Sequence, residues 1–439
     1  MDAREMVDLC KAHTMFSWSA GGKVDPIPFA GGEGVWFWEP SGKRYLDFNS
    51  QLMSVNIGHG HPRVRERMKE AVDRVIFAGP GMATEVRARL GQRLARKMPG
   101  DLDSIFFTLG GAEANENAIK AARLFTGRHK ILARYRSYHG ATHGAMSLTG
   151  DPRRWPNEPG MAGVVRVMDP RPLAFSFGDD EDALVANHLT YLDEVIRFEG
   201  PHTIAAMFIE TVTGTNGILP PPRGYLQGLR ALLDKYGILL VCDEVMCGFG
   251  RTGKWFAFEH GDIVPDILTM AKGLTSSYVP LGAMAVRRHI ADHFDHNVFW
   301  GGLTYNAHPF CLEVAMAVLD VMEEEGLVER SAAMGLVLQD KLAALAARHP
   351  SVRATRNIGL FGIVELAGDR QGTPLCNYNE AHALTGWLGK FFRAEGLYTL
   401  VQGSSFMCNP PLCITESELN HGLAIADRGL DHLDQQLFG

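Results

Sequence analysis

The sequence predicts an α/β fold in which a mostly parallel sheet is covered by helices on both faces. Short apolar runs alternate with helical stretches between about residues 60 and 310, and runs that are apolar on both faces are typical of buried parallel strands. The 439 residues, 46% of them hydrophobic and 21% charged, have the composition of an ordinary globular protein. At roughly 150 residues per domain, this length accommodates two or three domains.

The strands of the sheet are expected where short apolar runs are bounded by turn residues. Seven runs fit this description: 104–108, 130–133, 164–167, 204–209, 238–242, 267–271 and 282–286. Helices are expected where apolar residues recur at helical spacing: 61–78, 84–98, 112–125, 182–198 and 225–236. The alternation of the two patterns therefore predicts strands joined by helices, as a parallel sheet requires.

The two ends of the chain show a different pattern. Short strands separated by a turn are expected at 35–38 and 45–48. After Pro309, helices are expected at 311–324, 328–348, 380–395 and 416–433, with apolar segments at 352–366 and 397–401. We therefore expect a smaller α+β domain built from both ends: residues 1–58 contribute to it, 59–310 form the large domain, and 311–439 form its C-terminal part.

Composition and charge exclude several classes of protein. The net charge is -7 and no block of lysine or arginine stands out, so nothing indicates a nucleic-acid or anionic-membrane surface. No apolar stretch approaches the roughly 18 residues of a membrane span, and the N-terminus lacks the pattern of a signal peptide. Seven scattered cysteines favour a reduced compartment. We expect a cytoplasmic protein that acts on small molecules, with no nucleic-acid or membrane partner.

A pair of glycines follows the first predicted strand of the sheet. Ligands of open parallel sheets bind at the carboxyl ends of the strands, and here the run ending at Thr108 leads to Gly110 and Gly111 at the start of a helix. Backbone N–H groups at a helix N-terminus attract an anion. The motif therefore predicts a phosphate cradle, and a plain strand-to-helix turn is the alternative.

A second glycine motif, at residues 248–253, matches the pattern G-x-G-x-x-G. A dinucleotide fingerprint opens a helix directly after its strand, whereas five residues separate this motif from the preceding run and no clear helix follows. We interpret it as a structural turn, with nicotinamide binding as the alternative. His139 and His143 have the spacing of metal ligands, but no acidic or cysteine partner supports them, so we expect no metal.

Asp243 and Lys272 are the strongest chemical signal in the sequence. Each follows an apolar run, so both are expected at the same edge of the sheet. A buried carboxylate needs a partner, and a desolvated lysine becomes a nucleophile toward carbonyl groups. An aspartate, a lysine and a phosphate cradle are the groups that pyridoxal phosphate requires, while an ordinary ion pair is the alternative.

In these motifs the sequence resembles the class III aminotransferases, which are pyridoxal phosphate enzymes of fold type I. The resemblance covers nearly the whole chain and rests on Asp243-Glu244-Val245, residues 248–253, Pro265-Asp266-Ile267 and Ala271-Lys272-Gly273, with supporting matches at 111–114, 138–140, 221–225 and 304–309. Residues 15–19 and 50–53 resemble the branch that contains taurine:pyruvate and ω-amine:pyruvate aminotransferases. The resemblance implies a seven-stranded, mostly parallel sheet domain with helices on both faces and a smaller α+β domain.

The resemblance also implies a role for each motif residue. Lys272 would be the Schiff-base lysine and proton shuttle, and Asp243 would keep the ring nitrogen of the cofactor protonated. The remaining cofactor contacts would come from Gly111, Ala112, Tyr138, His139, Glu210, Val245 and Thr304. Thr304 would reach the phosphate from a neighbouring subunit, so the active sites would be shared between the subunits of a homodimer or a tetramer.

The implied reaction is a ping-pong transamination from an ω-amino acid or primary amine to a 2-oxo acid, with pyruvate as the expected acceptor. A pyridoxal phosphate aminomutase or amine phospho-lyase on the same scaffold is the alternative. The substrate pocket would include Trp18, Leu52, Met53, Phe77, Tyr138 and Gln402. Gln402 lies about where many members have an arginine that binds a carboxylate, and a glutamine supplies no charge. We therefore expect an amine whose far end is uncharged or apolar.

Overall fold

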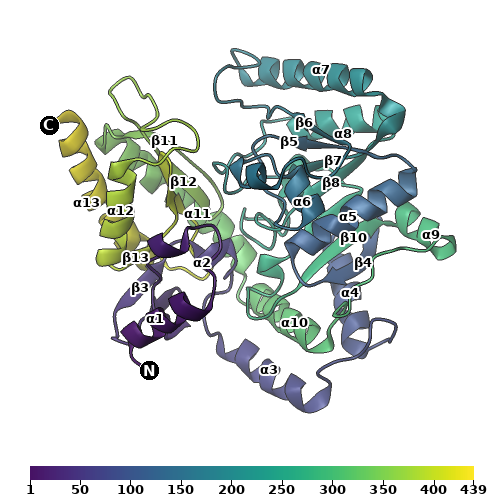
Figure 1. Ribbon diagram of the computed structural model, residues 1–439, viewed down its shortest axis with the longest axis horizontal. Coiled ribbons are helices and arrows are strands. Elements are labelled where there is room, and N and C mark those ends of the chain that lie inside the picture. Colours follow the sequence, from purple (N-terminus) through teal and green to yellow (C-terminus); the bar gives the residue numbers. More distant parts are fainter. The chain divides into compact units, whose positions relative to one another are not determined.

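The computed structural model describes all residues 1–439, and the chain divides into two compact units (Figure 1). The larger unit comprises Arg63–Leu336 and Arg356–Ile363, and the smaller unit comprises Met1–Pro62, Val337–Thr355 and Val364–Gly439. The division therefore falls within helix α11 (Leu327–Arg348), later than residue 310, where the sequence analysis placed it.

Helix α10 (Pro309–Glu324) explains why the larger unit extends beyond residue 310. It packs against helix α4 (Glu85–Lys97) of the same unit. Arg93 of α4 bonds Asp320 of α10 at 2.6 Å, and Lys97 is also paired with this helix, through Glu323. These contacts tie α10 to the larger unit, although it follows the last strand of the sheet in sequence.

A seven-stranded sheet forms the centre of the larger unit, with strand order β4-β10-β9-β8-β7-β5-β6. Its strands are β4 (Leu102–Thr108), β5 (Lys130–Arg134), β6 (Val164–Val167), β7 (Ile204–Glu210), β8 (Leu239–Asp243), β9 (Ile267–Met270) and β10 (Gly282–Arg287). All neighbouring pairs from β9 to β6 are parallel, and β10 runs antiparallel to both β4 and β9. The prediction of a mostly parallel sheet of seven strands is confirmed.

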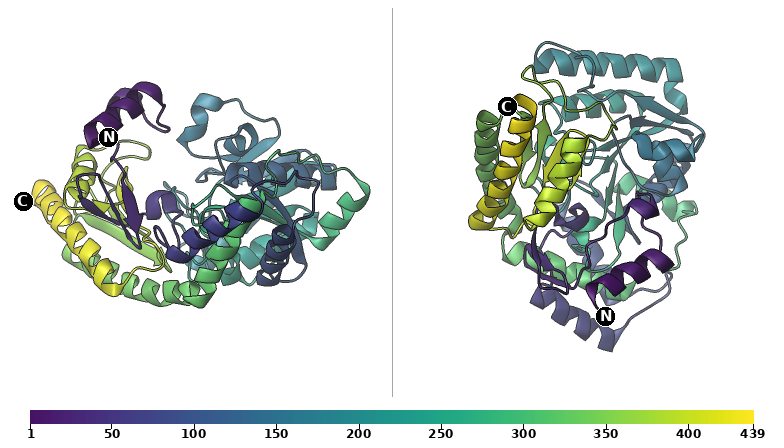
Figure 2. Two further views of the ribbon diagram at one scale, coloured as in Figure 1. Left: turned by 90° about the horizontal axis from the view of Figure 1, so that it is seen from below. Right: turned by 60° about the vertical axis from the view of Figure 1, so that its left-hand side comes forward.

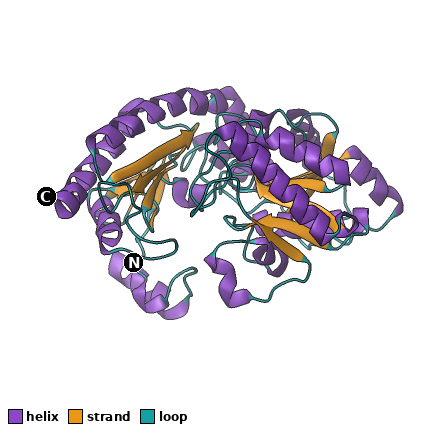
Figure 3. Cartoon of the chain, turned by 90° about the horizontal axis from the view of Figure 1, so that it is seen from above, coloured by secondary structure: helices purple, strands orange, loops and turns teal.

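Helices lie on both sides of this sheet (Figure 3). Those that contact its strands include α4, α5 (Gly111–Thr126) and α8 (Tyr225–Tyr236). Helix α7 (Glu181–Glu199) packs on α8, and α3 (Pro62–Arg74) begins the larger unit. The buried face of α5 carries small residues, among them Ala114, Ala118, Ala121 and Ala122. Small side chains let this helix approach β7, β9 and β10 closely. The start of the helix therefore lies near the carboxyl end of β8.

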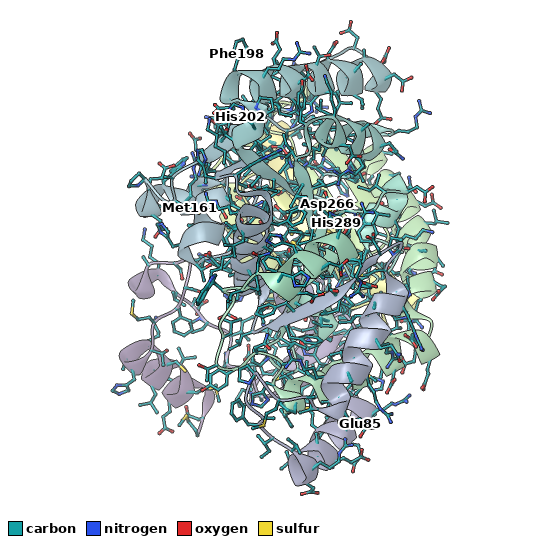
Figure 4. All side chains as sticks on the ribbon, turned by 90° about the vertical axis from the view of Figure 1, so that its right-hand side faces the viewer. Glu85, Met161, Phe198, His202, Asp266 and His289 are labelled. Atoms are coloured by element: carbon teal, nitrogen blue, oxygen red, sulfur yellow. The ribbon has the colours of Figure 1, made fainter.

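Asp266, which is labelled in Figure 4, directly precedes β9 and so lies at the amino end of this strand. Its Oδ2 accepts hydrogen bonds from Arg230 of α8 at 2.6 Å and from the backbone N–H of Leu240 at 2.7 Å. The Pro265-Asp266-Ile267 motif therefore links α8 to two strands at the edge that lies away from Asp243, where it has a structural role.

The smaller unit contains one four-stranded sheet and most of a second, of which residues 356–363 belong to the larger unit. One has the order β1-β2-β3-β13, from strands Gly31–Glu33, Trp36–Trp38, Arg44–Asp47 and Leu397–Tyr398. The other has the order β11-β12-β15-β14, from strands Val352–Ile358, Phe361–Leu366, Ser405–Cys408 and Val401–Gln402. Both chain ends lie in this unit, purple and yellow in Figure 2. A unit built from both ends was expected.

Helices of the smaller unit are α1 (Ala3–His13), α2 (Ser50–Met53), α12 (Ala383–Ala394) and α13 (Glu416–Phe438), and the C-terminal part of α11 joins them. Helix α1 was not predicted, and none of its residues is buried. Helices α6 (His143–Leu148) and α9 (Arg288–His296) were also missed. None of the helices combines the length and apolar character that crossing a bilayer would need.

The glycine motif at residues 248–253 is a turn, and no α-helix follows it. The backbone N–H of Phe249 donates to the carbonyl of Trp255 at 2.7 Å, which closes the turn. Gly253 has φ +84°, and a Cβ on it would lie 2.9 Å from the Cα of Ala332. The interpretation as a structural turn is confirmed: the positive φ of Gly253 and the close approach of Ala332 both require a glycine here.

Candidate active site

Three parallel strands bring the predicted reactive residues to one edge of the sheet. Strand β7 ends at Glu210 and β8 ends at Asp243, and these two residues are register partners. Asp243 is in turn the register partner of Thr269 in β9. Lys272 begins a short 3-10 helix three residues after Thr269. The two carboxylates and the lysine therefore converge at the carboxyl ends of the strands.

The amine of Lys272 lies in a buried, mixed electrostatic environment. Burial lowers the pKa of the amine below its ordinary value, and the positive charge of Arg153 lowers it further. The negative charges of Asp243 and Glu210 act in the opposite direction, and the net shift is downward. Lys272 also has φ +38°, a left-handed conformation that a non-glycine residue rarely adopts. Strained residues of this kind are concentrated at functional sites.

Glu210 is buried and accepts two backbone hydrogen bonds. Its Oε1 accepts from the N–H of Tyr138 at 2.9 Å, and its Oε2 accepts from the N–H of Gly214 at 2.8 Å. Burial raises the pKa of this carboxyl group, and the charge of Asp243 raises it as well. Glu210 therefore fixes the backbone at Tyr138. The nearby negative charge of Asp243 makes the ionised form of Glu210 less favourable.

Asp243 is almost fully buried, and its carboxylate accepts three hydrogen bonds. His139 Nδ1 and Asn115 Nδ2 each lie 2.8 Å from Oδ2, and the N–H of Val245 lies 3.0 Å from Oδ1. Asn115 was not among the predicted site residues. Its position four residues after Gly111 was the available signal, because residues at this spacing lie on one helical face.

Helix α5 begins at Gly111, where the sequence predicts a phosphate cradle. The first backbone N–H groups of a helix, here those of Gly111 and Ala112, have no partner within the helix. A Cβ on Gly111 would lie 2.8 Å from both methyl carbons of Val245, whereas a Cβ on Gly110 would meet nothing within 4 Å. Glycine at 111 thus lets the helix start pass directly beside Val245, and the residues present fit a phosphate group.

Arg153 is a second residue that the sequence analysis missed. Its guanidinium lies 3.7 Å from the centroid of the Tyr138 ring. Its Nε lies 3.0 Å from each oxygen of Asp151, and its Nη2 donates to Thr215 Oγ1 at 2.9 Å. No local motif distinguishes this arginine, and only the fold places it beside Tyr138 and within electrostatic reach of Lys272.

The other predicted site residues are divided between the two units. Thr304 and Phe77 are exposed in the larger unit, and the Phe77 ring contacts Tyr305, with centroids 6.2 Å apart. The smaller unit holds the remaining predicted pocket residues, of which Met53 is buried and three are exposed: Trp18, Leu52 and Gln402.

The aminotransferase class-III family matches residues 19–430 of this sequence. The chain belongs to the class III aminotransferases. The taurine–pyruvate aminotransferase of Bilophila wadsworthia is 30% identical over 456 residues, which cover 99% of each chain. The omega-aminotransferase of Caulobacter vibrioides is 32% identical, over 94% of this chain and 95% of the relative.

Solved structures of transaminases share the whole fold of this class III aminotransferase. Taurine:2-oxoglutarate aminotransferase from Bifidobacterium kashiwanohense, determined with PLP and glutamate, has a TM-score of 0.96 and 36% identity, with 100% of this chain and 99% of the other covered. An (S)-enantioselective omega-transaminase from Thermomicrobium roseum has a TM-score of 0.93 and 36% identity over the full length of both chains. The protein is thus a fold-type I, pyridoxal phosphate-dependent transaminase.

Proposed function

We propose that this transaminase takes its amino group from an ω-amino acid or ω-aminosulfonate and that Arg153 binds the anionic end of the substrate. The position of Arg153, stacked on Tyr138 and near the amine of Lys272, carries this proposal. A guanidinium binds carboxylate and sulfonate oxygens through charge-assisted hydrogen bonds. Gln402 alone favoured an uncharged substrate, but Arg153 supplies the charge that Gln402 lacks.

The residues at the carboxyl ends of the strands would each have a separate role in the reaction. Bound pyridoxal phosphate supplies a carbonyl group for the amine and an electron-poor ring. Lys272 Nζ would hold the cofactor and move a proton at the substrate carbon, and Asp243 would hold the proton of the ring nitrogen. The N–H groups of Gly111 and Ala112 would bind the phosphate.

Three further residues would position the cofactor ring. Tyr138 and Val245 would flank its two faces, as an aromatic ring and a branched apolar side chain suit this contact. Glu210, which already fixes the backbone of Tyr138, would orient groups near the ring oxygen. A 2-oxo acid would then accept the amino group in the second half of a ping-pong cycle.

The relatives support an anionic substrate. Two of the proteins compared above are named for taurine, whose far end is a sulfonate, and their acceptors are pyruvate and 2-oxoglutarate. Formation of alanine from pyruvate, or of glutamate from 2-oxoglutarate, would identify the acceptor. A product formed without any 2-oxo acid would instead indicate the aminomutase or phospho-lyase reaction.

A half-reaction assay tests the role of Arg153. Taurine, β-alanine and propylamine are each added to the holoenzyme, and the loss of its visible absorbance is followed. We expect the two anionic amines to react at lower concentrations than propylamine. Arg153→Gln should weaken the anionic amines by about 10-fold or more, the effect of a charge-assisted hydrogen bond, and leave propylamine within about 2-fold.

Arg154→Gln is the matched control for this assay. Arg154 is the next residue in the chain, and it pairs with Glu158 at 2.9 Å instead of stacking on Tyr138. It should behave as the unmodified enzyme with all three amines. An equal loss for all amines in Arg153→Gln, or a preference of the unmodified enzyme for propylamine, would contradict the proposal.

We also propose that the enzyme is a homodimer with shared active sites. Two exposed apolar side chains lie beside the predicted contact residue Thr304, namely its chain neighbour Tyr305 and Phe77, whose ring contacts Tyr305. Further apolar side chains of the larger unit are also exposed: Ile76, Met82 and Trp300. Large apolar patches of this kind mark protein interfaces, and a second copy of the chain is the partner that the role of Thr304 requires.

All seven cysteines are free, which supports a reduced, cytoplasmic location.

A further inference from the structure

We propose that Asn115 and Thr269 are positioning residues that hold the carboxylate of Asp243 in one orientation, with Oδ1 directed to the ring nitrogen of the cofactor. The proposal rests on the role proposed above for Asp243. It adds two residues to the site, neither of which would touch the cofactor itself.

The hydrogen bonds of Asp243 distinguish its two oxygens. A carboxylate has about four acceptor positions, two on each oxygen. Oδ2 uses both of its positions, for Asn115 Nδ2 and His139 Nδ1, each at 2.8 Å. Oδ1 uses one, for the N–H of Val245 at 3.0 Å. The acceptor position that remains is therefore on Oδ1.

The amide of Asn115 can have only one orientation. Its nitrogen faces two acceptors, Asp243 Oδ2 at 2.8 Å and the backbone carbonyl of His139 at 2.7 Å. Its oxygen accepts from the hydroxyl of Thr269 at 2.7 Å. A reversed amide would place its oxygen against a carboxylate and a carbonyl, so both amide protons are directed as described. Asn115 is fully buried, and water cannot replace these partners.

Thr269 connects this arrangement to the strand that leads to Lys272. It is the register partner of Asp243, and its backbone carbonyl accepts from the N–H of Glu244 at 2.9 Å. Its hydroxyl is the donor to Asn115, and its side chain is fully buried. One residue of β9 thus fixes both the end of β8 and the amide that holds Asp243.

Three donors of different kinds surround Asp243: a side-chain amide, a backbone N–H and an imidazole ring. Asn115 and the backbone of Val245 carry no charge. An ionised carboxylate only accepts, so His139 Nδ1 carries the proton of that contact, while His139 Nε2 is buried without a hydrogen-bond partner. A second proton on this ring would have no acceptor. The three donors therefore fix the orientation of the Asp243 carboxylate.

Four variants of the full-length enzyme test this proposal: Asn115→Leu, Thr269→Val, Thr269→Ser and Asp243→Asn. The measurements are the dissociation constant of pyridoxal phosphate, the pH midpoint of the visible absorbance of the holoenzyme, and the thermal stability of the apoenzyme. Thr126→Val is the matched control, because Thr126 lies on the same helix but its hydroxyl donates to the carbonyl of Ala122 at 2.7 Å.

Asn115→Leu should weaken cofactor binding by about 10-fold to 100-fold, since it removes a hydrogen bond to a charged group, and should shift the absorbance midpoint. Thr269→Val removes a neutral hydrogen bond and should weaken binding by about 2-fold to 10-fold. Thr269→Ser restores the hydroxyl and should return both values to those of the unmodified enzyme. The Thr126→Val control should leave both unchanged.

The outcomes separate this proposal from the proposed role of Asp243. If Asp243→Asn leaves cofactor binding and the absorbance midpoint unchanged, the role of Asp243 itself is wrong. If Asp243→Asn changes both but Asn115→Leu and Thr269→Val do not, the positioning proposal is overturned. A loss of apoenzyme stability in these two variants without a shifted midpoint would also overturn it, because it would show a purely structural role.

Discussion

The amine of Lys272 combines a buried location with a pKa below the ordinary value for lysine. A lysine reacts with carbonyl groups through its neutral form, so a lower pKa means that more of the amine is reactive at a given pH. The left-handed backbone at this residue holds the side chain at the end of β9, where the two carboxylates lie. Both features favour reaction with a carbonyl cofactor.

This electrostatic balance predicts how the reaction of Lys272 depends on pH. In the apoenzyme, the rate of absorbance gain on adding pyridoxal phosphate should rise with pH and reach half its maximum below pH 10.5, the ordinary pKa of lysine. Arg153→Gln removes a positive charge that lowers this pKa and should shift the midpoint upward. Asp243→Asn removes a charge that raises it and should shift the midpoint downward. Shifts in the opposite directions would contradict this account.

Gly111 offers a steric test of the anion cradle. Gly111→Ala would bring a Cβ to 2.8 Å from the methyl carbons of Val245, so the helix start or Val245 must move. We expect cofactor binding to weaken by about 10-fold or more, measured by fluorescence titration, since a displaced N–H loses a charge-assisted bond to phosphate.

Gly91→Ala is the control for this substitution. Gly91 lies within helix α4, and a Cβ there would meet nothing within 4 Å. Alanine at this position should leave cofactor binding unchanged and raise the stability of the helix slightly. Unchanged binding in Gly111→Ala would show that the close approach of Val245 does not matter for the cradle.

The sequence predicted that Asp243 and Lys272 lie at the carboxyl ends of strands, because each comes at the end of an apolar run, and the structure places these ends in adjacent strands. Asn115, Thr269 and Arg153 were missed for a different reason. Thr269 looks like an ordinary strand residue, and Arg153 resembles any surface arginine. Their partners are distant in sequence, and only the packing of α5 against the sheet brings Asn115 to Asp243.

At the scale of elements, runs of apolar residues predicted the seven strands of the large sheet, because burial on both faces leaves a clear pattern. Helix α8 was predicted with its observed bounds, Tyr225–Tyr236. The helices that were missed are short or have little buried surface, as α1 shows. The boundary between the units also escaped prediction, since it depends on which side α10 packs, and residue pattern alone does not reveal a packing partner.

The turn at residues 248–253 makes a prediction about Arg251. This residue is fully buried, its Nη1 donates to the carbonyl of Leu360 at 3.0 Å, and its own carbonyl accepts from Ser331 Oγ at 3.3 Å. Arg251→Met should destabilise the protein by about 2 kcal/mol, since a buried carbonyl loses a charged donor. Thermal unfolding measures this loss.

The same variant separates a structural arginine from one that binds substrate. Arg251→Met should leave the ratio of reactivity toward taurine and propylamine as it is in the unmodified enzyme. A selective loss of taurine reactivity would mean that Arg251, and not Arg153, binds the anionic end of the substrate.

At the scale of the whole molecule, the exposed apolar patch around Thr304 predicts a dimer of two 48.3 kDa chains. Analytical ultracentrifugation should show a particle of this mass or of the corresponding tetramer. Met82→Asp places a charge among the exposed apolar side chains of the larger unit. It should shift the protein toward the monomer, with weaker cofactor binding, because Thr304 would then lose its place at the neighbouring site.

Leu173→Asp controls for this effect, because Leu173 is an exposed apolar residue of the larger unit outside the patch. It should leave both the assembly state and cofactor binding unchanged. A monomeric enzyme with full cofactor affinity would contradict the shared site.

The pairing of β13 with β3 has a consequence during synthesis of the chain. Leu397 pairs with Leu46, so β3 has no partner on this side until some 350 further residues have been made. At typical rates of translation this takes roughly 20 to 70 seconds. An unpaired strand edge can join strands of other chains. Until the last residues leave the ribosome, the beginning of this protein therefore depends on chaperones or on its short strands to stay out of aggregates.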